Sequence, residues 1–262
     1  MIDTHAHFDD ESFDSDRESC WERALREGVR ALVVPAISPD RWQRPLSVAR
    51  EGAVFAALGV HPQALPAVSD EAIRAALDDV PSLVRERPKR VVAIGEVGFD
   101  HTIDLERASP ARQAAVFAWH AEVAVALGLP LIVHVLRAHE AALEALERVR
   151  LPRPAGVIHS YSGSAELVPR YERLGFYLSF AGAVTRRTAK RPIAAARAVS
   201  SDKLLLETDA PDQCPTGAPE GVTRCEPAML SLIARAVATA RGEDEAALRE
   251  RTEQNARRLF AL

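Results

Sequence analysis

In the stretch Arg90-Val91-Val92-Ala93-Ile94-Gly95-Glu96-Val97, a short apolar run leads to the ionisable side chain of Glu96. This pattern recurs along the 262-residue chain. The β-branched residues of the stretch favour a strand, and an unbroken apolar run indicates a strand buried on both faces, as in a parallel sheet. Similar runs occur at residues 1–5, 30–36, 54–60, 130–135, 155–160, 176–181 and 203–208. The sequence therefore predicts eight buried strands.

Segments of helical period separate these runs, among them residues 15–28, 69–86, 109–127 and 226–241. The third opens with Ser109-Pro110, a helix-start signal, and is followed by Gly128, a helix-stop signal. Eight strands alternating with helices, in a chain close to the usual length of about 250 residues, predict an α/β fold with one (β/α)₈ TIM-barrel domain over residues 1–262. An open doubly wound sheet is the main rival, but the Gly-rich turn it needs after the first strand is missing.

Composition narrows the functional classes. The formal net charge is −4, so the chain has no overall basic field that would gather nucleic acid, and attraction to a polyanion must be local. The spacing of Cys20, Cys214 and Cys225 matches no zinc-finger pattern, which favours reduced thiols. No signal peptide and no membrane-length apolar run is apparent. We expect a cytoplasmic protein without membrane attachment, and no obligate protein partner is evident.

Ionisable side chains stand at the ends of most of the apolar runs. The carboxyl ends of the strands in a parallel barrel form one rim, where active sites are built. Six of these side chains offer nitrogen or oxygen donors that suit Mg²⁺, Mn²⁺ or Zn²⁺. The expected metal ligands are His5, His7, Glu96, His134, His159 and Asp209.

The arrangement also suggests individual roles. His5 and His7 alternate along a strand, so both imidazoles point to one face and can grip one cation. Glu96 lies between Gly95 and Gly98, which we interpret as backbone room for the close approach of a metal, and its two oxygens can bridge two cations. Asp209 is expected to bind one metal and to accept a proton from the attacking water. Asp209 and Glu96 are therefore the predicted catalytic residues.

Other polar residues have weaker assignments. His61 ends the third run, and a contact with substrate or with a ligand is favoured over a structural role. His101 is equally well interpreted as a substrate contact or as an idle loop residue. His120 and His139 lie in predicted helices and are expected to be solvent-facing or satisfied core residues. Glu207 is expected on the opposite face of its strand from the site.

The basic run Thr185-Arg186-Arg187-Thr188-Ala189-Lys190-Arg191 follows the seventh strand, where barrels often hold phosphate. A solvated helix start explains the same run equally well. Both interpretations stay open at the level of sequence.

The chain resembles the TatD family of metal-dependent nucleases over essentially its whole length. The resemblance is carried by Asp3-Thr4-His5-Ala6-His7-Phe8, Gly59-Val60-His61-Pro62, Ala93-Ile94-Gly95-Glu96-Val97-Gly98-Phe99-Asp100, Ile132-Val133-His134, Ile158-His159-Ser160-Tyr161-Ser162-Gly163-Ser164, Leu206-Glu207-Thr208-Asp209-Ala210-Pro211 and Asn255-Ala256-Arg257-Arg258-Leu259-Phe260.

The resemblance implies a hydrolase with two divalent metal ions that acts on phosphodiester bonds in DNA, often as an exonuclease, here expected to be of the 3′-5′ type. It implies His5, His7, Glu96 and Asp209 around one ion, and Glu96, His134 and His159 around the other. DNA or another phosphodiester is then the expected partner.

Departures from the family pattern concern the substrate contacts. Leu136 stands where the family usually has a basic residue, and Arg137 is a possible substitute for it. Cys225 replaces the usual Asn after Arg224, which we expect to contact substrate, and His101 replaces an aromatic residue. A metal-dependent amidohydrolase or esterase acting on a small amide, ester or aminoacyl bond is therefore the alternative. A non-catalytic barrel that only binds a ligand is a third interpretation, although all six expected ligands are present.

Overall fold

The computed structural model describes residues 1–87, 89–219, 221–222 and 224–262. Within these ranges eight parallel strands follow one another around a single sheet in the order of the sequence. They are β1 (Ile2–Asp3), β2 (Ala31–Pro35), β3 (Val54–Leu58), β4 (Val91–Asp100), β5 (Leu131–Leu136), β6 (Gly156–Ile158), β7 (Phe176–Phe180) and β8 (Leu204–Leu206). Every predicted strand is present, each within a few residues of its expected bounds.

Strand β8 returns to β1 and so closes the sheet into a barrel. The backbone N–H of Thr4 donates to Leu206 O at 3.2 Å, and the Thr4 hydroxyl donates to the same carbonyl at 3.0 Å. Just beyond the strands, the N–H of Asp209 donates to His5 O at 2.9 Å. The (β/α)₈ TIM barrel is thereby confirmed, and the doubly wound sheet is excluded.

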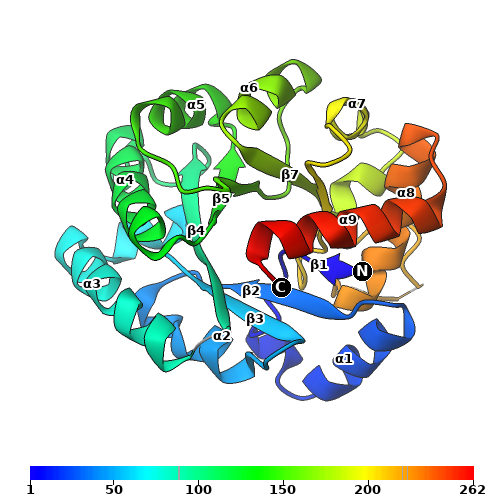
Figure 1. Ribbon diagram of the computed structural model, residues 1–262, viewed down its shortest axis with the longest axis horizontal. Helices are drawn as coiled ribbons and strands as arrows, with labels where there is room; N and C mark the ends of the chain where they lie inside the picture. Colours follow the sequence, from blue (N-terminus) through cyan, green and yellow to red (C-terminus); the bar gives the residue numbers. More distant parts are fainter. Residues whose placement is uncertain (88, 220, 223) are drawn as a thin grey trace.

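Helices surround the barrel in chain order, as Figure 1 shows. Their bounds are α1 (Arg17–Arg26), α2 (Gln43–Val48), α3 (Asp70–Glu86), α4 (Pro110–Leu127), α5 (His139–Arg148), α6 (Val168–Arg173), α7 (Lys190–Ala198), α8 (Leu230–Arg241) and α9 (Glu245–Phe260). Short 3₁₀ helices are η1 (Glu11–Phe13), η2 (Pro39–Arg41), η3 (Pro62–Ala67), η4 (Ala165–Leu167), η5 (Gly182–Thr185) and η6 (Pro227–Met229). Among the described residues, no helix combines the length and the apolar character that crossing a bilayer requires.

Helix α4 illustrates how local sequence sets the bounds of an element. The Ser109 hydroxyl accepts a hydrogen bond from the N–H of Arg112 at 3.2 Å, and Pro110 occupies the first turn. Gly128 ends the helix with a left-handed φ of 66°, a conformation that glycine adopts without steric cost. Both the start and the stop predicted from Ser109-Pro110 and Gly128 are confirmed.

Alternate residues along the strands belong to two different apolar clusters. In β2, Leu32 and Val34 pack outward against the helices, whereas Ala31 and Val33 belong to a second cluster inside the barrel. The inner cluster fills the barrel with side chains from all eight strands, so the barrel is a packed core and not a pore.

Helix α9 closes the amino end of the barrel, lying across it with the C-terminus near the barrel axis in Figure 1. Its residues Ala256, Leu259 and Phe260 belong to the inner cluster. The Asn255 amide donates to Leu204 O and to Ser201 O, both at 2.9 Å, and so fixes the helix to β8. The carboxyl end is left as the open end, where the polar side chains of the strands gather.

Candidate metal centre

All six expected ligands meet at the carboxyl end of the barrel. In the first donor group (His5, His7, Glu96 and Asp209), the Nε2 atoms of the two histidines lie 3.3 Å apart. Glu96 Oε2 lies 3.2 Å from the His5 nitrogen and 3.7 Å from that of His7. Asp209 Oδ1 lies 3.5 Å and 3.8 Å from the same two nitrogens. Four donor atoms thus surround one small volume.

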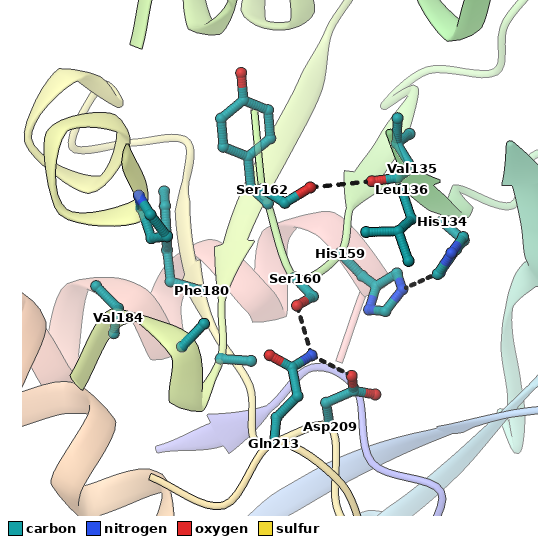
Figure 2. Close-up of a pocket in the computed structure, with 14 residues that line it drawn as sticks. His134, Val135, Leu136, His159, Ser160, Ser162, Phe180, Val184, Asp209 and Gln213 are labelled. Atoms are coloured by element: carbon teal, nitrogen blue, oxygen red, sulfur yellow. Dashed lines mark hydrogen bonds between the residues drawn. The ribbon is translucent and has the colours of Figure 1, made fainter. Parts of the chain in front are cut away.

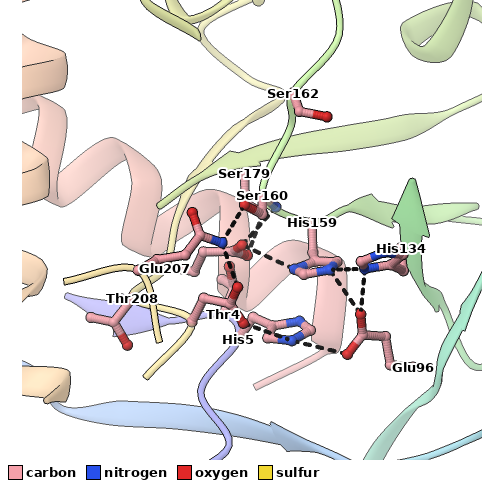
Figure 3. A network of polar contacts seen from close by, with 12 residues as sticks. Thr4, His5, Glu96, His134, His159, Ser160, Ser162, Ser179, Glu207 and Thr208 are labelled. Atoms are coloured by element: carbon pink, nitrogen blue, oxygen red, sulfur yellow. Dashed lines mark hydrogen bonds and ion pairs between the residues drawn. The ribbon is translucent and has the colours of Figure 1, made fainter. Parts of the chain in front are cut away.

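The other oxygen of Glu96 organises a second donor group (Glu96, His61, His134 and His159), which Figure 3 shows in part. Glu96 Oε1 lies 2.8 Å from His159 Nε2, 3.1 Å from His134 Nδ1 and 3.2 Å from His61 Nε2. His134 Nδ1 and His159 Nε2 are 3.0 Å apart. One carboxylate therefore faces both groups, each through one of its oxygens.

The geometry fits divalent cations. Nitrogen and oxygen ligands at about 2.0–2.2 Å around one ion lie roughly 3–3.5 Å from each other, which is close to the spacing in both groups. Glu96 is only 1% exposed, yet its Oε2 atom has no hydrogen-bond partner among the described residues. A buried carboxylate oxygen without a partner carries a large desolvation cost, which a bound cation would remove.

Two further carboxylates orient the histidines of the second group. Glu207 Oε1 lies 3.2 Å from His159 Nδ1 and accepts from the N–H of Ser160 at 2.6 Å, while its other oxygen accepts from the Ser179 hydroxyl. Asp100 Oδ2 lies 3.4 Å from His134 Nε2. A carboxylate behind a metal-binding imidazole fixes its orientation and its tautomer.

The expectation that Glu207 faces away from the site is therefore wrong. Glu207 stands two positions after Leu205, which faces the barrel interior, and so points to the same face. His134 after Ile132 and His159 after Val157 obey the same rule. This parity was the signal in the sequence that identifies Glu207.

A buried aspartate joins the first group to the end of β8. Asp3 accepts from the N–H of Thr208 at 3.0 Å and from its hydroxyl at 2.6 Å. Burial raises the pKa of Asp3 to about 8, against the lowering effect of the Thr208 hydrogen bonds. Because Asp3 is two residues before His5 and Thr208 directly precedes Asp209, this contact sets the distance between two of the first group's donors.

The glycines around Glu96 have a different role from the one expected. A Cβ atom at Gly95 would lie 2.6 Å from Ile132 O, and one at Gly98 would overlap the carbonyl of His134. The space beside both residues is thus filled by the backbone of β5. The interpretation of these glycines as room for a metal is corrected: they allow β4 and β5 to approach closely and so bring Glu96 to His134.

Electrostatics couple the two groups. Burial would raise the pKa of Glu96, but the charges of His159, His61 and His5 outweigh it and hold that pKa well below its usual range. Burial likewise opposes protonation of His159, yet Glu96 and Glu207 raise its pKa well above the usual value. The cluster therefore favours a positive charge beside Glu96, which is the electrostatic condition for holding a cation.

A cavity of about 290 Å³ opens next to the donors (Figure 2). His134, His159 and Asp209 form one side, and Leu136, Phe180, Ala183, Val184 and Pro192 contribute apolar walls. Gln213 reaches into it, where its amide donates to Ser160 Oγ at 2.6 Å and to Asp209 Oδ2. A reactant in this cavity would lie directly against the ligands.

The residues expected to contact substrate lie at different distances from the donor groups. His61 lies inside the second donor group, with its Nε2 atom 3.2 Å from Glu96 Oε1, and so is closer to the expected ligands than the sequence indicated. Arg137 is exposed and follows Leu136 at the rim, and the N–H of His101 donates to Leu136 O at 3.0 Å, so both stand beside the cavity. Both stay predictions as substrate contacts.

Arg224 is engaged elsewhere. Its guanidinium donates to both oxygens of Asp16 at 2.9 and 2.7 Å and to Glu226 at 2.8 Å, and it stacks on Phe13 at 4.4 Å. These contacts link the loops after β1 and β8, and the substrate contact expected of Arg224 stays a prediction.

Leu136 and Cys225, the two residues that depart from the family pattern, lie in different surroundings. Leu136 lines the cavity, whereas Cys225 is fully buried with its sulfur 3.9 Å from Thr208 O. Cys225 is thus part of the packing under Asp209. Like Cys20 and Cys214 it forms no disulfide, in agreement with the expected free thiols.

Sequence reasoning missed Asp3, Asp100 and Gln213 because none of them contributes an atom to either donor group. They act on the donors through hydrogen bonds or close contacts, and their partners are distant in the sequence. His120 is a core residue whose Nε2 atom accepts from the N–H of Val60 at 3.1 Å, as expected. His139 is half-buried, and its Nδ1 atom lies 2.9 Å from the Tyr171 hydroxyl.

Comparison with known proteins adds the family. A model of the TatD related DNase family matches residues 2–261. The uncharacterized metal-dependent hydrolase YjjV of Escherichia coli is 36% identical over 81% of this chain and 80% of its own length. A 3′-5′ ssDNA/RNA exonuclease TatD of Musicola paradisiaca is 30% identical over 100% and 98% of the two chains. The crystal structure of YjjV superimposes with a TM-score of 0.90 at 32% identity, covering 100% of this chain and 98% of that one. The chain therefore belongs to the TatD related DNase family of metal-dependent hydrolases.

Proposed function

We propose that this chain is a phosphodiesterase of the deoxyribonuclease type that uses two divalent ions and removes nucleotides from the 3′ end of single-stranded DNA. The observation that carries the proposal is Glu96, whose two oxygens face two separate donor groups at 2.8–3.7 Å. The first group would hold one ion and the second the other. Since one sheet and its two apolar clusters span the chain, we also propose a single domain over residues 1–262.

Bound divalent ions would supply charge stabilisation for a phosphoryl transition state and a lowered pKa for water. We assign the acceptance of a proton to Asp209; its side chain is partly exposed and lines the cavity that the reactant would enter, which supports this role. Gln213 holds Asp209 Oδ2 from the far side, which keeps the carboxylate turned toward His5 and His7. Nitrogen donors outnumber carboxylates in the second group, which favours Zn²⁺ over Mg²⁺ there.

The size of the cavity supports attack at a chain end. A cavity of about 290 Å³ beside the donors has room for about one terminal unit of a polymer. The relative named 3′-5′ ssDNA/RNA exonuclease TatD supports the same direction and polymer class. We further propose that the protein acts in the cytoplasm without an obligate protein partner.

The test uses oligonucleotides labelled at the 5′ or the 3′ end, with Mn²⁺ or Mg²⁺ present. We expect stepwise shortening from the 3′ end that stops with chelator, and a loss of at least about 10³-fold in kcat/KM when His5 and His7 are both replaced by Ala. The control is Arg26→Ala, which replaces an exposed residue at the amino end of the barrel and should keep wild-type activity. Activity that survives the double replacement would contradict the proposal.

Leu136 gives specific support to the alternative of ester or amide hydrolysis, because it lines the cavity with an apolar side chain where the family resemblance implies a basic one. The same donors can serve attack on a carbonyl group. A panel of small esters, amides and aminoacyl compounds, run beside the oligonucleotides, separates the two functions: turnover of the panel alone would establish the alternative.

A further inference from the structure

The loop that joins β7 to α7 forms the outer lip of the cavity. Ala183 and Val184 in η5 line the cavity before the loop, and Pro192 in α7 lines it afterwards. Between them stand four cationic side chains, all exposed, which we call the basic lip: Arg186, Arg187, Lys190 and Arg191. A chain that leaves the cavity on this side must pass these side chains.

The four charges of the basic lip are available. Within the described ranges of the chain, none of them has a carboxylate oxygen within 4.0 Å. Glu166 on η4 is influenced by Arg191, but the Ser164 hydroxyl has the larger effect in lowering its pKa, and no ion pair forms. Unpaired cations that cluster on a surface raise the local concentration of anions.

The loop after β1, two strands around the closed barrel from β7, has a different electrostatic character. The loop after β1 carries a run of acidic residues, namely Asp9, Asp10, Glu11, Asp14 and Asp16. The arginines near it are already paired: Arg44 with Asp14 at 2.8 Å, and Arg224 with Asp16 at 2.7 Å. Ion pairs therefore largely neutralise the charge on the β1 side, whereas the described residues leave the cations of the basic lip without carboxylate partners.

We propose that the basic lip binds the backbone phosphates of a single-stranded polynucleotide next to the unit held in the cavity, and so sets the path by which the strand leaves the active site. This inference rests on the proposed phosphodiesterase function and adds the position and the direction of the strand. Because the net charge of the chain is −4, this local field has to supply the attraction that the whole protein does not.

The test compares two variants that lose the same charge at opposite ends of the barrel. The lip variant replaces the four residues of the basic lip by Gln. The control variant replaces four exposed arginines at the amino end by Gln: Arg26, Arg150, Arg153 and Arg258. Binding of a fluorescent 20-nucleotide oligo(dT) is measured by anisotropy in chelator, where no cleavage occurs, over a range of salt concentrations.

We expect the lip variant to bind the oligonucleotide on the order of 100-fold more weakly at about 0.1 M salt, and its salt slope to fall by roughly 3, since each lost phosphate contact removes about 0.7 from the slope for single strands. The control variant should bind nearly as the wild type does. With metal present, kcat/KM on the 20-mer should fall by a similar factor, while kcat/KM on bis-p-nitrophenyl phosphate, which has no second phosphate to contact, should not change.

Equal losses in both variants would overturn the inference, because they would show an effect of total charge. An unchanged lip variant would overturn it as well. Failure of the proposed function is distinguishable: the wild type would then cleave neither the 20-mer nor the small phosphodiester, whereas the anisotropy comparison would still report whether the basic lip binds the strand.

Discussion

The two ends of the barrel are built on the same strands and differ in what the interior face presents. At the amino end this face carries Ile132, Val157 and Leu205, which α9 covers with Leu259 and Phe260. Two positions further along the same strands it carries His134, His159 and Glu207. The apolar end can therefore supply stability, while the polar end holds charged groups at a cost in desolvation.

Because of this difference, we expect substitutions at the two ends to affect stability and catalysis separately. Changes at the amino end should alter the free energy of unfolding and leave the chemistry intact, and changes at the carboxyl end should do the reverse.

Phe260→Ala removes a side chain that is 3% exposed and belongs to the cluster inside the barrel. We expect a loss of about 3–5 kcal/mol in the free energy of unfolding, because the truncation leaves a cavity in packed surroundings. The measurement is denaturant unfolding of the metal-free protein. Arg258→Ala, on an exposed face of the same helix, should cost less than about 0.5 kcal/mol. A kcat/KM reduced in the folded Phe260→Ala protein would break the separation.

His120 is a buried histidine outside the donor groups, and it tests the packed shell between barrel and helices. Burial lowers the pKa of His120 to about 4, and the carbonyl of Val116 offsets this only in part. Between pH 6.5 and 4 the unfolded chain binds a proton that the folded protein does not, so stability falls as the pH falls through this range, by about 3 kcal/mol in all.

His120→Gln removes this titration while keeping one acceptor for the N–H of Val60 and one donor for Val116 O. Chemical unfolding from pH 7 to pH 4 should show a shallower fall of stability in the variant than in the wild type. Parallel curves would show that His120 is not the group that titrates.

Glu207→Gln tests whether the carboxylate behind His159 serves the site or only the packing. The amide keeps the size and can still accept from the N–H of Ser160, but it loses the charge that raises the pKa of His159. We expect a loss of about 10–100-fold in metal affinity, with little change in the unfolding free energy of the metal-free protein. Ser179→Ala, which removes only one hydrogen bond to Glu207, should have a smaller effect on affinity in the same titration.

The sequence was sufficient for the fold and for the first layer of the site, for physical reasons that Ile132 and His134 illustrate. A strand buried on both faces must be apolar until it approaches the rim, so its first ionisable residue marks a position in the active site, even where the strand continues beyond it, as β5 does to Leu136. The helix start at Ser109 and the helix stop at Gly128 depend on contacts within a few residues, so they too could be predicted from the sequence.

What could not be predicted depends on contacts between distant segments. Asp3 meets Thr208 across 205 positions, and the guanidinium of Arg224 meets Asp16 across 208. No local pattern encodes such pairings. The sequence indicated that Gly95 matters for the site, but the predicted reason, room for a metal, was wrong. Only the structure shows that the backbone of β5 fills the space beside Gly95.

In the proposed centre, Glu96 joins two metal sites at the carboxyl end of the barrel. Elemental analysis of purified, metal-reconstituted protein tests it most directly, with Glu96→Gln as the variant and circular dichroism to verify its fold. We predict two divalent ions per wild-type chain and a loss of both, or retention of less than one, in the variant. Two ions per chain in a folded Glu96→Gln protein would contradict the account.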